Sequence, residues 1–252
     1  MTILYNVLVT LACLAFGYLF GSFSTSIAIG KIFFNQDPRN FGSKNPGGTN
    51  SGRLWGKKVG LLIILLDMIK TILPIWLAYF FLRYVKFDGK SLLAPIEILK
   101  NGNESEYLIN WPIYWIVPLG SMLGHCYPIF YKFKGGKGVS NFFGMELGTC
   151  WGLFLSSGLV FITSLKIKKY VSLSSIIGSI SGAIFSWIWS ILQLLKVLPK
   201  SLYSFISYGD VLFPNYVLSI ILTMMSLILI LRHKDNIIRL RNKTESKISW
   251  LK

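Results

Sequence analysis

Long apolar runs alternate with short polar segments along the whole of this 252-residue chain. Because the hydrocarbon core of a bilayer needs about 20 apolar residues in helical form, each long run is expected to cross a membrane. The pattern therefore predicts an all-α polytopic membrane protein, built as a single domain over 1–252. The expected spans are 3–34, 59–82, 111–131, 172–195 and 213–231.

One further apolar region, 139–165, allows two interpretations. Its 27 residues form a single span, or they form two short helices that turn near 148–152. The first interpretation gives six transmembrane helices in all, and the second gives seven, two of them short.

The distribution of basic residues favours seven spans, because cytoplasmic loops carry an excess of Lys and Arg. Seven spans, with the N-terminus outside and the C-terminus in the cytoplasm, put 19 Lys and Arg inside and 6 outside. Six spans would instead place either the basic segment 166–169 or the basic tail 232–252 outside. On the seven-span topology, the connections 84–110 and 196–212 are external and peripheral to the chemistry. The inside groups are 31–58, 132–137, 166–169 and 232–252.

The composition agrees with a membrane protein and makes other classes poor candidates. Apolar residues form 53% of the chain and charged residues 14%, against roughly 25% charged in a soluble domain. A net charge of +16 would suggest nucleic acid in a soluble protein. Here the basic residues lie between apolar runs, where they orient spans and attract anionic lipid or phosphorylated substrates. We therefore expect no nucleic acid as a partner.

Cysteines and histidines give no sign of a metal site. The three isolated cysteines and two histidines lack metal-site spacing, so we expect no metal and no cofactor.

The polar segment 37–53 is the first candidate for binding an anion. Its glycines allow consecutive N–H groups to converge, and Arg53 supplies a planar fork suited to phosphate. The alternative is a flexible polar loop between spans. The neutral donors in this segment are Ser43, Asn45, Thr49 and Asn50.

The second candidate is Lys-Phe-Lys-Gly-Gly-Lys-Gly at 132–138. Backbone amides and a Lys ammonium in such a loop can surround a phosphate, and a helix that starts near Val139 would point its positive end at the same anion. The alternative is a membrane-orienting anchor with a glycine turn. The candidate residues are Lys134, Gly135, Gly136, Lys137 and Gly138.

The third candidate, 232–239, follows the last expected span. At helical spacing His233, Asn236 and either Arg239 or Leu240 share a face, whereas a basic tail that binds anionic lipid is the alternative. Weaker signals lie within the spans. Ser172 is a hydroxyl at the mouth of one span, Asp67 and Lys70 form a charged i, i+3 pair inside another, and Glu146 has no evident partner.

These motifs resemble those of the bacterial acyl-phosphate:glycerol-3-phosphate acyltransferases, the PlsY family. Gly-Ser-Lys-Asn-Pro-Gly-Gly-Thr-Asn at 42–50 is similar to the first signature of that family, and 132–138 is similar to the second. The segment 232–240, followed by Thr-Glu-Ser-Lys at 244–247, is similar to the third. Leu-Asp-Met-Ile-Lys at 66–70 and Val-Ser-Leu at 171–173 also fit in the expected order.

The resemblance implies seven spans, an external N-terminus and a cytoplasmic active site in a multi-pass protein of the bacterial plasma membrane. It implies transfer of a fatty acyl group from acyl phosphate to the 1-position of sn-glycerol 3-phosphate, which gives lysophosphatidic acid and phosphate. Ser43, Arg53 and Lys137 would then clamp phosphate with Ser172 nearby. His233 and Asn236 would orient the glycerol hydroxyl or the developing oxyanion. Because the sequence shows no obvious strong base, we expect the donor's own phosphate to accept the proton, with His233 as the rival acceptor.

Three positions depart from the family signatures: Lys44 replaces the usual Gly, Gly48 replaces Ala and Lys243 replaces Gly. The resemblance further suggests a monomer that is linked functionally to a soluble enzyme producing acyl phosphate. A transporter of a phosphorylated solute is the main alternative, although transporters show matched halves, and a lipid-binding scaffold is the third.

Overall fold

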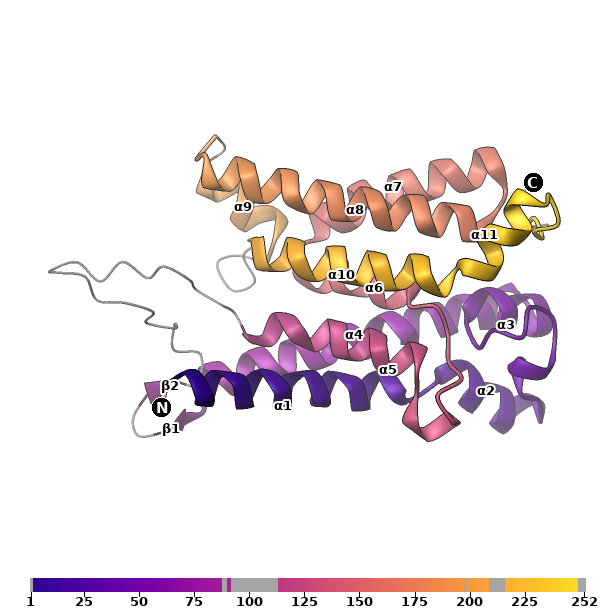
Figure 1. Cartoon of the computed structure of the whole chain (residues 1–252), viewed down its shortest axis with the longest axis horizontal. Helices are drawn as coiled ribbons and strands as arrows, with labels where there is room; N and C mark the ends of the chain where they lie inside the picture. The colour runs from indigo at the N-terminus through magenta and orange to yellow at the C-terminus, as the bar shows by residue number, and fades with distance from the viewer. Residues whose placement is uncertain (1, 88–89, 92–112, 198, 209–215, 249–252) are drawn as a thin grey trace, which may run out of the picture.

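The computed structural model describes residues 2–87, 90–91, 113–197, 199–208 and 216–248. Its helices lie side by side along one axis, and a short strand pair lies near the N-terminus (Figure 1). The α-helices are α1 (Thr2–Ser22), α2 (Thr25–Phe34), α3 (Gly48–Trp55), α4 (Lys57–Tyr84), α5 (Val117–Cys126), α6 (Val139–Thr149), α7 (Trp151–Lys168), α8 (Val171–Leu194), α9 (Lys200–Ile206), α10 (Tyr216–Arg232) and α11 (Lys234–Arg241). The remaining elements are η1 (Pro38–Asn40), η2 (Ile113–Ile116), η3 (Ile129–Tyr131), β1 (Lys86–Phe87) and β2 (Lys90–Ser91).

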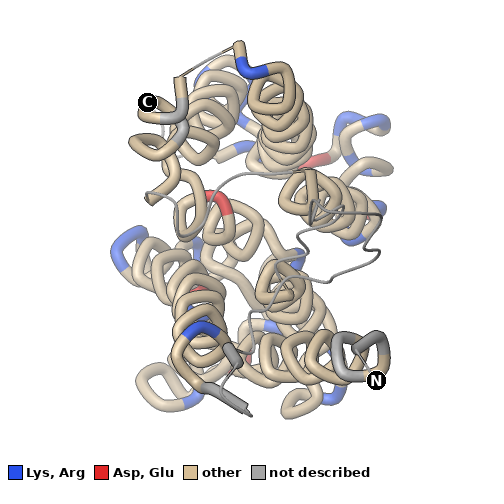
Figure 2. The backbone as a smooth tube through the Cα atoms, turned by 90° about the vertical axis from the view of Figure 1, so that its left-hand side faces the viewer, with Lys and Arg blue, Asp and Glu red and all other residues tan. Residues whose placement is uncertain are grey.

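The two ends of the bundle differ in what they hold. Figure 1 places α2, α3, α11 and the C-terminus at one end, and the N-terminus, β1, β2 and α9 at the other. We call the end formed by α2, α3, α11 and the loop 132–138 the motif end. Seen along the helices, the bundle has acidic residues (red) at few positions and basic residues (blue) at many (Figure 2). The three polar segments of the sequence therefore share one end.

Three helical stretches among the described residues are long and apolar enough to cross a membrane: Val7–Phe34, Lys57–Tyr84 and Val171–Leu194. The pair α10 and α11, bent by 57°, adds a fourth if it counts as one stretch. The expected spans 59–82 and 172–195 are thus confirmed as α4 and α8.

The expected span 3–34 is not one unbroken helix. Ser24 has an extended backbone, and its side chain accepts a hydrogen bond from the N–H of Ile27, which is how an N-cap starts a new helix. The run therefore consists of α1 and α2, which together still give one stretch long and apolar enough to cross a membrane, Val7–Phe34.

The region 139–165 forms two helices, as the second interpretation held. α6 ends at Thr149, Cys150 has an extended backbone, and α7 starts at Trp151. At about 1.5 Å per residue, the 11 residues of α6 rise only about 16 Å, so α6 alone is much shorter than a bilayer core.

The expected span 111–131 is shorter than predicted. It begins, within the described residues, as η2 and continues as α5 to Cys126, after which η3 forms a separate turn. The part of 213–231 that the structure describes is α10. Most of the connection 84–110 and part of 196–212 lie outside the described residues.

Close helix packing at the motif end depends on small residues. A Cβ on Gly17 or Gly21 of α1 would collide with backbone atoms of α5, and a Cβ on Gly120 or Gly124 of α5 would collide with α1. Such small-residue faces let two membrane helices approach closely and gain van der Waals contact. α1 and α5 consequently pack with their backbones in close contact.

Candidate active site

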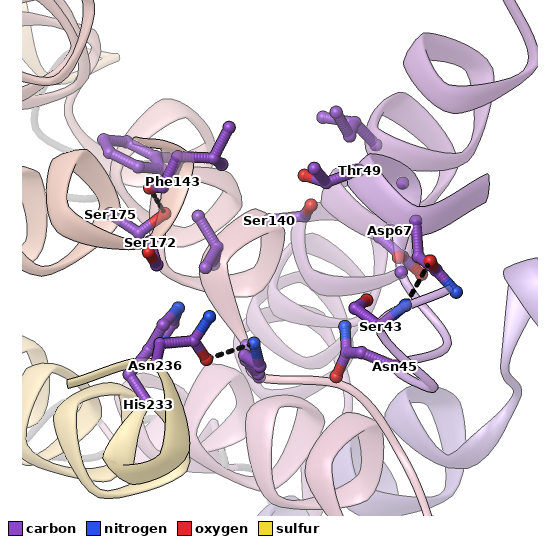
Figure 3. Close-up of a pocket in the computed structure, with 18 of the residues that line it drawn as sticks. Ser43, Asn45, Thr49, Asp67, Ser140, Phe143, Ser172, Ser175, His233 and Asn236 are labelled. Atoms are coloured by element: carbon purple, nitrogen blue, oxygen red, sulfur yellow. Dashed lines mark hydrogen bonds between the residues drawn. The ribbon is translucent and has the colours of Figure 1, made fainter. Parts of the chain in front are cut away.

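A cavity of about 1190 Å³ opens at the motif end. In Figure 3 Ser43, Asn45 and Thr49 lie on one side of it, and Ser172, His233 and Asn236 lie on the other. Ten of the thirteen candidate site residues line it: Ser43, Asn45, Thr49, Asn50, Arg53, Lys137, Gly138, Ser172, His233 and Asn236.

The segment 37–53 is an ordered loop followed by α3. The Asn50 side chain donates hydrogen bonds to the carbonyls of Pro38 and Phe41, and its oxygen accepts one from the N–H of Ser43. Asn50 therefore uses its amide to hold the loop, although it lines the cavity. Arg53 is exposed and its guanidinium makes one long contact of 3.5 Å, to the carbonyl of Ser246.

The two lysines that depart from the family signatures, Lys44 and Lys243, share one unusual backbone conformation. Both have a left-handed backbone, with φ of 55° and 58°, which is the conformation that glycine adopts without strain. Lysine there costs roughly 1 kcal/mol of conformational energy. Both lysines therefore occupy positions where glycine would be less strained.

The loop 132–138 contributes only its last two residues to the cavity. Lys137 and Gly138 line it, whereas Lys134, Gly135 and Gly136 do not. The N–H of Gly136 donates to the carbonyl of His125 at 2.9 Å. The contact of the Gly136 amide with a phosphate stays a prediction.

A hydrogen-bonded chain crosses the cavity wall from Lys137 to Ser172. The Lys137 ammonium donates to Asn236 Oδ1 at 2.6 Å, and Asn236 Nδ2 donates to Glu245 Oε1 at 2.7 Å. The same carboxylate accepts from Ser172 at 2.8 Å and from Arg239 Nε at 2.7 Å. Glu245 is therefore the hub of the candidate site. It belongs to the third motif, but it was given no role because a carboxylate is an unexpected group beside an anion.

Burial and neighbouring charges set the protonation of this chain. Burial alone would raise the pKa of Glu245, but the hydrogen bonds from Arg239, Asn236 and Ser172 hold that pKa below its ordinary value. Burial lowers the pKa of Lys137 to about 8, against the opposing attraction of Glu245. Lys137 is consequently a cation at neutral pH that loses its charge within the mildly alkaline range.

His233 lies at the bend between α10 and α11. Burial, with the nearby Lys137 charge, lowers the pKa of His233 to about 4, so the imidazole is neutral at pH 7. Its Nδ1 lies 2.8 Å from the carbonyl of Leu229. Because a carbonyl can only accept, Nδ1 carries the hydrogen, and Nε2 is left with a lone pair that can accept a hydrogen bond.

The rest of the cavity wall is apolar. Phe143 of α6 lies on the side of the cavity that holds Ser172 and Ser175 (Figure 3). Leu61 of α4 and Ile162 of α7 also line the cavity, and they are 49% and 50% exposed. The cavity thus combines a polar part at the motif end with an apolar part lined by α4, α6 and α7. The other apolar residues that line it are Ile64, Met68, Val139, Phe154, Phe161 and Val171.

Two further residues at the cavity were not assigned to the site from sequence. Asp67 and His125 line it and are 2% and 7% exposed. From sequence, Asp67 was a charged partner of Lys70 within the segment 66–70 that fits the family pattern, without a role in the site. His125 lies 55 positions from Lys70, and no local pattern links the two.

The bundle and this two-part cavity define an integral membrane protein that can hold an anionic group next to an apolar chain. The family model described as glycerol-3-phosphate acyltransferase matches residues 11–243. The chain belongs to the glycerol-3-phosphate acyltransferase family, and it is an acyltransferase.

Curated relatives and solved structures agree with this membership. A glycerol-3-phosphate acyltransferase of Staphylococcus aureus (strain JH9) is 35% identical over 242 residues, which cover 94% of this chain and 97% of the relative. The crystal structure of PlsY, an integral membrane glycerol 3-phosphate acyltransferase, in its glycerol 3-phosphate form is 28% identical, with a TM-score of 0.69 and 96% of each chain covered. Its lysophosphatidic acid form is 27% identical, with a TM-score of 0.68 and the same coverage.

Proposed function

We propose that the protein transfers a fatty acyl group from acyl phosphate to the 1-hydroxyl of sn-glycerol 3-phosphate, which gives lysophosphatidic acid and phosphate. The observation that carries the proposal is a single cavity with a cationic polar part and an apolar part in which Leu61 and Ile162 are about half exposed. A phosphorylated substrate fits the first part, and a fatty chain fits the second.

The polar part recognises phosphate. Arg53 offers a planar fork, Lys137 offers an ammonium, and Ser43 adds a hydroxyl, all on the cavity lining. We place Ser172 beside them, since its hydroxyl already belongs to the chain that ends at Lys137. These groups hold both phosphates in place and lower the cost of the charge that develops on the leaving group.

His233 and Asn236 act at the reacting centre. The lone pair on His233 Nε2 accepts a hydrogen bond from the 1-hydroxyl and directs its oxygen toward the acyl carbonyl. One N–H of Asn236 remains for the carbonyl oxygen, since the other donates to Glu245. The hydroxyl oxygen forms the new ester bond, the acyl–phosphate bond breaks, and the departing phosphate takes the proton. An acyl phosphate is a mixed anhydride with a good leaving group, so positioning and electrostatics supply most of the rate.

The topology proposed for this enzyme has seven spans in the bacterial plasma membrane, formed by α1, α4, α5, α6, α7, α8 and α10. The N-terminus is outside, and the motif end faces the cytoplasm, where glycerol 3-phosphate is found. The excess of Lys and Arg in the segments at the motif end supports this orientation. The protein works as a monomer that receives acyl phosphate from a soluble enzyme.

Purified protein in detergent, given labelled glycerol 3-phosphate and palmitoyl phosphate, tests the proposal. We expect lysophosphatidic acid to form without coenzyme A or carrier protein. Equal or better activity with acyl-coenzyme A would overturn the choice of donor. Movement of glycerol 3-phosphate across sealed vesicles, without product formation, would favour the transporter instead.

A further inference from the structure

A cluster of charged and polar side chains lies buried beside the loop 132–138. The Lys70 ammonium is 2.8 Å from Asp67 Oδ1 and 2.9 Å from His125 Nδ1. The Thr25 hydroxyl donates to Asp67 at 2.6 Å, so α2, α4 and α5 meet in this cluster. All four side chains are at most 8% exposed. We call Thr25, Asp67, Lys70 and His125 the Lys70 cluster.

The imidazole of this cluster touches the loop that carries Lys137. A Cβ on Gly136 would collide with His125 Nε2, and the N–H of Gly136 donates to the His125 carbonyl at 2.9 Å. The backbone of Gly136 has no positive φ, so the backbone conformation does not require glycine here. The imidazole requires it, because the ring occupies the space of any side chain.

Arg232 holds the same loop from α10. Its guanidinium donates to the carbonyls of Gly135 and Gly136 at 3.0 to 3.2 Å, and it lies 4.9 Å from the ring centroid of Tyr127. The loop is thus fixed by the Lys70 cluster and by Arg232, immediately before Lys137.

We propose that the Lys70 cluster positions the loop, through the contact of His125 with Gly136, so that the Lys137 ammonium meets the substrate phosphate. This inference rests on the proposed function. Buried charges are expensive within a membrane and mark functional elements, and Lys70 neutralises Asp67 while it fixes the orientation of the imidazole. A displacement of about 1 Å at a binding group can lower the rate roughly a hundredfold. Accurate placement of the loop is therefore a functional reason for keeping costly buried charges in the Lys70 cluster.

The first test replaces His125 with alanine in the full-length protein. The ion pair of Asp67 and Lys70 remains, so the fold is expected to survive. We expect His125→Ala to raise KM for glycerol 3-phosphate by roughly tenfold or more with a smaller change in kcat, because a phosphate contact made before and during reaction is weakened. Hydrogen–deuterium exchange at the Gly136 amide should accelerate, with the helices unchanged. The matched control is Ser190→Ala, which removes a buried hydrogen bond to Ser219 between α8 and α10.

The second test is a double-mutant cycle, which separates contact from general damage. Gly136→Ala alone should impair binding severely, because its Cβ meets the imidazole. In the His125→Ala background, Gly136→Ala should impair binding much less. If His125→Ala does not fold, His125→Asn keeps an acceptor for Lys70 and removes the ring.

Two results would overturn the inference: an unchanged KM and unchanged exchange in His125→Ala, or an equal cost of Gly136→Ala in both backgrounds. The exchange measurement needs no turnover. If the wild-type protein had no acyltransferase activity, the proposed function would be wrong. The contact between His125 and the loop could still be tested by the exchange measurement.

Discussion

The charge state of one residue, Lys137, is expected to set the alkaline limit of the enzyme. Its pKa of about 8 means that the free enzyme loses the ammonium as pH rises through this value. Of the two forms of Lys137, only the charged ammonium attracts phosphate. The value of kcat/KM for glycerol 3-phosphate, which reports the free enzyme, should therefore fall above about pH 8. In Lys137→Arg this alkaline limb of the pH profile, the fall in kcat/KM, should disappear, because a guanidinium stays charged.

Steady-state kinetics from pH 6 to about 10 check this expectation, with circular dichroism at each pH to show that the fold is intact. His233, with a pKa of about 4, cannot produce a limb in this range. A fall at the same pH in both proteins would assign it to another group.

Glu146 is a residue whose role sequence left open, and the structure gives it a partner. It is fully buried in α6, and Ser157 of α7 donates to its Oε2. Its Oε1 has no hydrogen-bond partner within the described part of the chain and lies where a Cβ on Gly182 of α8 would be. The side chain therefore fills the junction of three helices.

We expect Glu146→Gln to leave stability nearly unchanged, because an amide keeps the shape and accepts the same bond from Ser157. Glu146→Ala should lose about 2 kcal/mol through the cavity it creates, which corresponds to a fall in Tm of roughly 4 to 8 °C. Thermal unfolding in detergent measures both. A Gln variant as unstable as the Ala variant would show that the acid itself is needed.

At the scale of elements, the bend between α10 and α11 brings the third motif over the cavity. Sequence spacing placed His233 and Asn236 on one helical face, but α11 begins after His233, at a 57° bend. Both side chains nevertheless line the cavity. The bend itself was beyond prediction, because no Gly or Pro marks it in the sequence.

Asn236, on the first turn of α11, is expected to act mainly on turnover. Asn236→Ala removes the N–H assigned to the acyl oxygen, so kcat should fall roughly a hundredfold, the usual scale for one oxyanion donor. Saturation kinetics with both substrates measure the effect. A loss confined to KM for glycerol 3-phosphate would mean that Asn236 serves only to hold Lys137.

The elements also show what local sequence can and cannot predict. The apolar runs predicted α4 and α8 within two residues at each end, because membrane helices must satisfy their backbone within the segment. The cap at Ser24 was missed, since hydropathy averages across one serine. The contact between Lys70 and His125 was missed as well, since only the packing of α4 against α5 brings these residues together.

At the scale of the whole molecule, all catalytic segments must lie on one side of the membrane. In a variant without native cysteines, single cysteines at Lys58 and Asn242, both exposed at the motif end, should resist an impermeant thiol reagent in intact cells. A cysteine at Lys196, exposed just after α8 ends, should react. Labelling at Lys58 or Asn242 from outside would contradict the seven-span topology.

The opening between α4 and α7 has a consequence for how the enzyme samples its substrates. Leu61 and Ile162 line the cavity and are about half exposed, so we expect a fatty donor to enter here from the two-dimensional lipid phase, while glycerol 3-phosphate arrives from three-dimensional solution. The donor's effective concentration is then its mole fraction in the bilayer or micelle. Adding inert lipid at constant total donor should slow the reaction, as surface dilution does, and leave the apparent affinity for glycerol 3-phosphate unaltered.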